Sequence, residues 1–152
     1  MEKIYLASSL HTNELKNRID IIVDFLREKG NIVYSPKELK IPNAWDIPNH
    51  EWARKVYDND IKELTNANVV VCIYNGFNFA GGTGTAWEIG FAKAMNKDVI
   101  VLCTDSTAKQ SLMIVNSGVL VMPYEKYKDA WEIYINKTVD FPYIHPSIKD
   151  QS

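Results

Sequence analysis

The stretch VVVCIY, residues Val69–Tyr74, consists of six consecutive apolar or aromatic residues. Such a run, rich in β-branched side chains, is typical of a strand that is buried on both faces of a parallel sheet. Four further runs are rich in residues that favour strands, namely Lys3–Ala7 (KIYLA), Asn31–Ser35 (NIVYS), Asp98–Cys103 (DVIVLC) and Val119–Met122. The chain is therefore predicted to contain five strands.

Helical patterns separate these strands. Thr12 or Asn13 can cap a helix in which apolar residues recur every three or four positions until Gly30 ends it. The segments over 37–48 and from Thr138 onward contain prolines and are predicted to be irregular. The other helices are predicted over Asn49–Asn66, from a start close to Glu88, near Lys109–Val115 and over Tyr124–Asn136.

This alternation of strands and helices predicts a three-layer α/β fold, in which helices cover both faces of an open, parallel, five-stranded sheet. The expected strand order is 2-1-3-4-5, as in flavodoxin-like (Rossmann-like) proteins. Ligands bind such sheets beyond the carboxyl ends of the strands, so we expect a site near the loops Ser8–Thr12 and Asn75–Gly82. Residues 1–152 have a length that is typical of one domain.

The composition narrows the classes of function. Hydrophobic residues form 46% of the chain and charged residues 24%, which is ordinary for a globular protein, and the net charge is −2. No run of lysine or arginine favours nucleic acid or an anionic membrane as a partner. No apolar stretch reaches the roughly 18 residues of a membrane span, so a cytoplasmic protein is expected. Cys72 and Cys103 are expected to be buried free thiols, and no metal-binding motif occurs.

Glu88 is the first candidate for chemistry. It lies within GGTGTAWEIGFAKA, residues 81–94, and is the only charged residue between Glu63 and Lys93. An acid among apolar neighbours usually has a partner or a function. We expect the Gly/Thr turn and the start of a helix to favour its ionised form, which a carboxylate nucleophile requires. The alternative is a glutamate that only complements the helix dipole.

Asp60 and Tyr5 are the next candidates. The helical spacing places Asp60 on a stripe that faces inward. The alternative is that Ile61 occupies the buried position, and Asp60 is then a surface acid. Beside Glu88, it would push the pKa values of the two acids apart. Tyr5 lies in the middle of the first strand, where its hydroxyl could orient a carboxylate, although most such tyrosines are core residues. The stripe consists of Ala53, Val56, Tyr57, Asp60 and Leu64.

The loop after the third strand contains candidates for binding. Phe77 and Phe79 could stack on a planar base or close over a ligand, unless they only anchor the loop. The glycines around Thr83, including Gly82 and Gly84, are suited to phosphate binding but match neither established glycine-rich phosphate motif.

Three segments, taken together, resemble the nucleoside 2-deoxyribosyltransferases. They are IYLAS at 4–8, YDNDI at 57–61 and GTGTAWEIGFA at 82–92. The resemblance implies that Glu88 attacks the anomeric carbon of a deoxyribose, that Tyr5 hydrogen-bonds Glu88, and that Asp60 helps to protonate the leaving base. It implies a deoxynucleoside and a free nucleobase as substrates and no cofactor. It also implies dimers or larger assemblies, in which Ser111 and Met113 reach the neighbouring subunit's site.

Two departures leave the activity open. Gly82 stands where many transferases have an aspartate, and Ser111 stands where they usually have asparagine. The related deoxynucleoside 5′-monophosphate N-glycosidases have serine in both places, and Ser9, Thr83 and Ser111 could offer hydroxyls to a phosphate. His11 stands where these N-glycosidases have an arginine. The alternatives to base exchange are therefore hydrolysis of a deoxynucleotide and nucleotide binding without catalysis.

Overall fold

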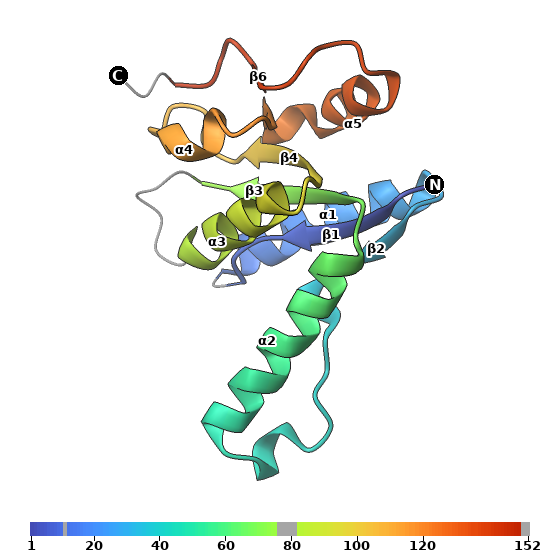
Figure 1. The fold of residues 1–152 in the computed structure, drawn as a ribbon, viewed down its shortest axis with the longest axis vertical. Coiled ribbons are helices and arrows are strands. Elements are labelled where there is room, and N and C mark those ends of the chain that lie inside the picture. The colour runs from blue at the N-terminus through green and yellow to red at the C-terminus, as the bar shows by residue number, and fades with distance from the viewer. Residues whose placement is uncertain (11, 76–81, 150–152) are drawn as a thin grey trace.

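The computed structural model describes residues 1–10, 12–75 and 82–149, and Figure 1 shows its three layers. A single sheet lies between helices on its two faces, so the predicted α/β class is confirmed. In chain order the elements are β1 (Lys3–Ala7), α1 (Asn13–Glu28), β2 (Ile32–Tyr34), η1 (Pro36–Glu38), η2 (Ala44–Asp46), α2 (Asn49–Asn66), β3 (Val69–Tyr74), α3 (Gly82–Ala94), β4 (Asp98–Cys103), α4 (Leu112–Val115), β5 (Leu120–Pro123), η3 (Tyr124–Lys126), α5 (Tyr127–Asn136) and β6 (Tyr143–Ile144).

The sheet is parallel throughout, with the order β2-β1-β3-β4-β5-β6. The order predicted for the first five strands is confirmed, whereas the predicted number of strands is wrong. In the tail, the backbone N–H groups of Tyr143 and His145 donate to carbonyl oxygens of Val119 and Val121 at 3.0 and 2.8 Å. These bonds form the sixth strand, whose two residues are too few to show any periodicity in the sequence.

Alternation along the strands divides the core into two halves. Ile4 and Leu6 of β1 pack against α1 and α5, whereas Tyr5 and Ala7 face α3 and the end of α2. The second half also contains Cys72 and Cys103, which are buried and free, as expected. Tyr5 therefore points toward the same side of the sheet as α3, the helix that contains Glu88.

The helices differ from the expected ones mainly at their starts. The side chain of Thr12 accepts a bond from the Leu15 N–H at 3.1 Å and caps α1, as predicted. In contrast, α3 begins at Gly82, so Glu88 is its seventh residue and not its first. The predicted helix at Lys109–Val115 is reduced to the four residues of α4. No helix in the described part of the chain is long and apolar enough to cross a membrane.

Helix α2 and the segment before it extend well beyond the sheet (Figure 1). Only Leu64, near the end of α2, is buried, whereas Ala53 and Tyr57 are exposed. The predicted inward stripe is therefore wrong for the first half of α2, because nothing in the described chain covers that half. In the predicted irregular segment over 37–48, the short helix η1 overlaps the start and η2 lies within, and Trp45 of η2 is fully exposed.

Candidate active site

A cavity of about 510 Å³ lies between α2 and α3 on the Tyr5 side of the sheet. This volume is within the range of small-molecule sites. Helix α2 contributes two polar or aromatic side chains and two aliphatic ones, and α3 contributes its first turns. The lining residues are Tyr57, Asp60, Ile61, Leu64, Thr83, Gly84, Trp87 and Glu88.

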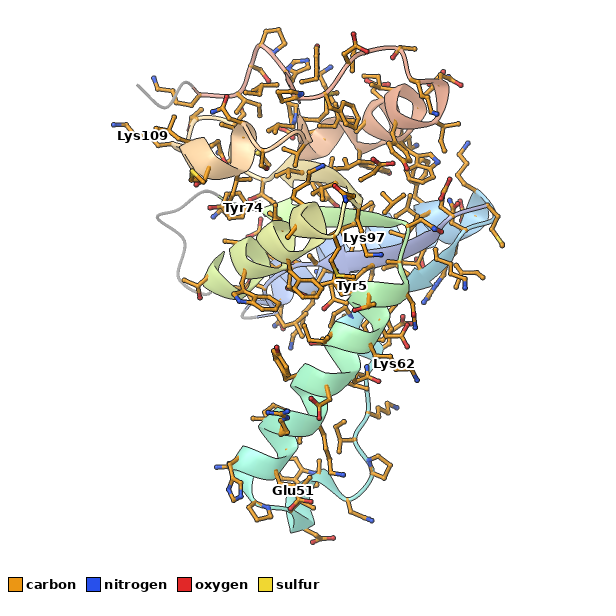
Figure 2. All side chains as sticks on the ribbon, in the orientation of Figure 1. Tyr5, Glu51, Lys62, Tyr74, Lys97 and Lys109 are labelled. Atoms are coloured by element: carbon orange, nitrogen blue, oxygen red, sulfur yellow. The ribbon has the colours of Figure 1, made fainter. Side chains whose placement is uncertain are left out.

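Tyr5 holds Glu88 from the sheet side. The Tyr5 hydroxyl donates a hydrogen bond to Oε2 of Glu88, as the sequence suggested. Burial and the nearby Glu88 carboxylate raise the pKa of Tyr5, so its hydroxyl keeps the proton that it donates. Figure 2 shows Tyr5 between α3 and the end of α2 that is close to the sheet, whereas Glu51 marks the far end of α2. Among the described residues, no hydrogen bond reaches the other oxygen, Oε1.

The protonation of Glu88 differs from the expectation. Burial raises the pKa of Glu88 to about 7, with a further increase from the charge of Asp60, while the Tyr5 hydrogen bond acts to lower it. The predicted stabilisation of the ionised form by a helix start is therefore wrong. The helix start has little effect on Glu88 because this residue lies in the second turn of α3, and dipole effects are strongest in the first turn.

Asp60 lies half-buried on α2 and lines the same cavity as Glu88, which confirms its inward orientation. Its Oδ1 accepts a hydrogen bond from the Tyr34 hydroxyl at 3.0 Å. Burial raises the pKa of Asp60, and the bond from Tyr34 acts to lower it. Ile61, the competing residue for the inward position, also lines the cavity. Two carboxyl groups with raised pKa values therefore share one small cavity.

The sequence did not single out the aromatic wall of the cavity or the partners of Asp60. Trp87 lies 6.2 Å from Tyr57 between ring centroids, in an edge-to-face arrangement, and stacks on Phe91 at 5.2 Å. Spacing between Trp87 and Phe91, four residues apart on a helix, could have indicated this stack. No comparable pattern points to Tyr34, which bonds Asp60, or to Asn59, which bonds Tyr34, because their proximity depends on the pairing of β2 with β1 and on the approach of α2.

The other predicted binding residues are distributed unevenly. Thr83 and Gly84 line the cavity, whereas Gly82 is the buried first residue of α3. Three predicted residues are not among those that line the cavity, namely Ser9, Ser111 and Met113. Met113 is 82% exposed, and Ser111 is the N-cap residue of α4. The predictions for Phe77 and Phe79 concern positions outside the described residues, as does that for His11.

The arrangement has the parts that displacement at an acetal-like carbon requires. Within the described part of the chain, one carboxylate oxygen of Glu88 has no hydrogen-bond partner, and Asp60, which can hold a proton, lines the same cavity between α2 and α3. Two carboxyl groups in one site can divide the roles of nucleophile and acid, as they do in glycoside hydrolysis. In the described part of the chain, no three His, Cys, Asp or Glu side chains gather in a way that could hold a metal ion.

Comparison with known proteins agrees with this chemistry. The family model for nucleoside 2-deoxyribosyltransferase matches residues 4–128. The 2-deoxyribosyltransferase of the psychrotolerant bacterium Bacillus psychrosaccharolyticus is 26% identical, with a TM-score of 0.71, over 94% of this chain and 97% of that one. No curated protein sequence matches.

Two more distant structures share the fold. The CMP N-glycosidase of Clostridium botulinum is 20% identical, with a TM-score of 0.58, over 86% of this chain and 98% of that one. A conserved protein from Enterococcus faecalis V583 is also 20% identical, with a TM-score of 0.57, over 95% of this chain and 80% of that one. The family match covers most of the sequence and includes Tyr5, Asp60 and Glu88. This chain belongs to the nucleoside 2-deoxyribosyltransferase family.

Proposed function

We propose that this protein exchanges the base of 2′-deoxyribonucleosides through a covalent deoxyribosyl intermediate on Glu88. The observation that carries the proposal is the pair of carboxyl groups in one cavity, with Glu88 held by Tyr5 and Asp60 held by Tyr34. The match to the family model supports the class of reaction.

In the first half-reaction, Oε1 of the ionised Glu88 attacks C1′ of the bound deoxynucleoside. The bond between C1′ and the base nitrogen breaks, and its electron pair leaves with the base. Asp60 donates a proton to the departing base, which then leaves as a neutral molecule. Positive charge on the sugar is largest in the transition state, where the nearby Glu88 carboxylate stabilises it before the ester bond forms.

In the second half-reaction, a nitrogen of an acceptor base attacks C1′ from the opposite face to Glu88. The ester bond breaks, Glu88 leaves as a carboxylate, and Asp60 recovers a proton from the incoming base. The product is a new deoxynucleoside, and the sequence of two displacements gives ping-pong kinetics. If water attacks instead, the products are free deoxyribose and the base released earlier.

The lining of the cavity supports recognition of a flat, partly polar ligand. Tyr57 and Trp87 present ring surfaces, each about half exposed, on which a base can stack. Thr83 and Gly84 bring a hydroxyl group and uncovered backbone to the start of α3. In this proposal the rings contact the base, and the first turn of α3 contacts the sugar.

Gly82 and Ser111 favour a second candidate function, which is hydrolysis of a deoxynucleoside 5′-monophosphate. An aspartate at the position of Gly82 would repel a phosphate, and glycine removes that charge. Thr83 is in the cavity, and Ser9 and Ser111 are hydroxyl-bearing residues of the flanking loops. The fold shared with the Clostridium botulinum CMP N-glycosidase is compatible with this candidate.

We also infer that the protein assembles into a homodimer or a larger homo-oligomer with shared active sites. Leu112 and Met113 of α4 are 61% and 82% exposed, and α4 packs against α3, the helix of Glu88. Exposed apolar side chains on a short helix that packs against α3 favour burial against another subunit. In a symmetric dimer, such a surface would close the site of the partner.

One assay separates the candidates. The protein is incubated with deoxynucleosides or with deoxynucleoside 5′-monophosphates, each with and without a second free base, and the products are identified by chromatography. Base exchange requires new deoxynucleoside that forms only when the acceptor is present. Hydrolysis of the monophosphate gives free base and deoxyribose 5-phosphate without an acceptor, and binding without catalysis gives neither. Glu88→Ala serves as the control and should abolish all turnover, so exchange by a folded Glu88→Ala protein would refute the proposal.

A further inference from the structure

Tyr34 donates a hydrogen bond to Asp60, as Tyr5 does to Glu88. The two tyrosines are direct partners in the register of β1 and β2. Their rings stack with centroids 5.5 Å apart and planes inclined by 29°. One hydroxyl holds Glu88, and the other holds Asp60. Two adjacent strands therefore supply one tyrosine for each carboxyl group of the cavity.

The hydrogen bonds of Tyr34 have a fixed direction. The side-chain amide of Asn59 donates to the Tyr34 oxygen at 2.6 Å, and an amide N–H can only donate. The single hydroxyl proton of Tyr34 is therefore directed to Oδ1 of Asp60, at 3.0 Å. Burial and the charge of Asp60 raise the pKa of Tyr34, so this proton stays on the hydroxyl.

This arrangement distinguishes the two oxygens of Asp60. Oδ1 is occupied as an acceptor, and among the described residues no hydrogen bond reaches Oδ2. A proton bound by Asp60 therefore resides on Oδ2, because a proton on Oδ1 would meet the one that Tyr34 donates. Asp60 lines the cavity, so a proton on Oδ2 remains available to a ligand.

We propose that Tyr34 is a positioning residue, which fixes the Asp60 carboxyl group so that one defined oxygen delivers the proton to the leaving base. The proposal rests on the function proposed above and deepens it. Asn59 has a supporting role, since it orients the Tyr34 hydroxyl toward Asp60. Tyr34 touches neither the sugar nor the base in this account and acts only through Asp60.

The test uses Tyr34→Phe, which keeps the ring that stacks on Tyr5 and removes the hydroxyl. Base release is followed in single turnovers, without an acceptor, on deoxynucleosides whose bases differ in how much they need protonation to leave. We expect release to slow about tenfold for the bases that depend most on protonation, a part of the roughly 10²–10⁴-fold effect of a general acid. Release of bases that leave without protonation should be almost unchanged, and so should the KM for the donor.

The matched control is Tyr134→Phe, which removes another hydrogen bond from tyrosine to aspartate. The Tyr134 hydroxyl donates to Asp98 at 2.8 Å, at the start of β4 and away from the cavity. This variant should release every base at the wild-type rate. A double-mutant cycle adds a second criterion, because Tyr34→Phe should have no further effect in an Asp60→Asn background if the tyrosine acts through Asp60.

Two results would overturn the role of Tyr34, namely an equal slowing for every base and an effect that persists in the Asp60→Asn background. If Tyr34→Phe does not fold, Asn59→Ala replaces it. This second variant should show the same dependence on the base to a smaller extent, and an effect without that dependence contradicts the proposal. Failure of the proposed function is distinguishable, because the wild-type protein would then form no new deoxynucleoside when an acceptor base is added.

Discussion

The carboxyl group of Glu88 is balanced between two opposing influences. Burial and the charge of Asp60 favour its neutral form, and the Tyr5 hydroxyl favours the ionised form. With a pKa of about 7, the empty site contains both forms near neutral pH. A partly dehydrated carboxylate is a better nucleophile than a solvated one, so burial of the Glu88 carboxylate favours the reaction that we propose.

The role of Tyr5 predicts a shift in the pH profile. For a donor whose base leaves without protonation, only the ionised Glu88 is required, so kcat/KM should rise with pH and level off above the pKa of Glu88 in the free enzyme. Tyr5→Phe removes the hydrogen bond that lowers this pKa, so the rising limb should move to higher pH. Tyr124→Phe is the control, because its hydroxyl donates to the Arg18 carbonyl in the other half of the core. A profile unchanged by Tyr5→Phe would contradict the role of Tyr5.

The elements show how far periodicity alone predicts this structure. The bounds of β1, β3, β4 and α2 agree with the prediction residue by residue, because apolar runs and helical spacing are strong over those segments. The start of α3 was missed because glycines favour turns, although Gly82 and Gly84 belong to the first turn of the helix. On α2, the spacing correctly indicated the inward face at Asp60 and Leu64, but it did not reveal that the first half of the helix has no sheet beneath it.

The two exposed glycines of α3 allow a matched test of the cavity wall. Gly84 and Gly90 both have open space where a Cβ would be added, but only Gly84 lines the cavity. Each change to alanine should stabilise the protein by about 0.5–1 kcal/mol, since glycine is a poor helix former. Denaturant unfolding should therefore show similar gains for Gly84→Ala and Gly90→Ala. Only Gly84→Ala should raise the KM for the deoxynucleoside, and an equal KM in both variants would remove Gly84 from the binding site.

At the scale of the whole molecule, the site is assembled from elements far apart in the sequence. The sequence could indicate Glu88, Asp60 and Tyr5 because each has a local pattern or lies in a segment that resembles the family. Tyr34 could not be found in this way, since its role follows from the pairing of β2 with β1 and from the approach of α2. Parallel pairing thus determines which side chains share the cavity.

The inferred assembly predicts that two inactive variants restore each other. Glu88→Ala lacks the nucleophile, and Met113→Arg is expected to place a charge at the neighbouring site, so each should be inactive alone. Refolded together in equal amounts, they should recover about one quarter of wild-type activity, because half of the dimers are mixed and each has one intact site. Light scattering gives the oligomeric state in parallel. No recovery from a mixture that forms dimers would contradict a shared site.

The covalent intermediate is the central claim, and mass spectrometry of the intact protein and of its peptides tests it most directly. The protein is mixed with a deoxynucleoside in the absence of an acceptor base, quenched with acid during turnover and digested for peptide mapping. We predict a mass increase equal to one deoxyribosyl group, located on Glu88, with Glu88→Gln showing neither the adduct nor base release. Two observations together would contradict a covalent intermediate on Glu88. The wild-type protein would exchange bases rapidly while its quenched samples never contain an adduct on Glu88, and Glu88→Gln would continue to exchange bases.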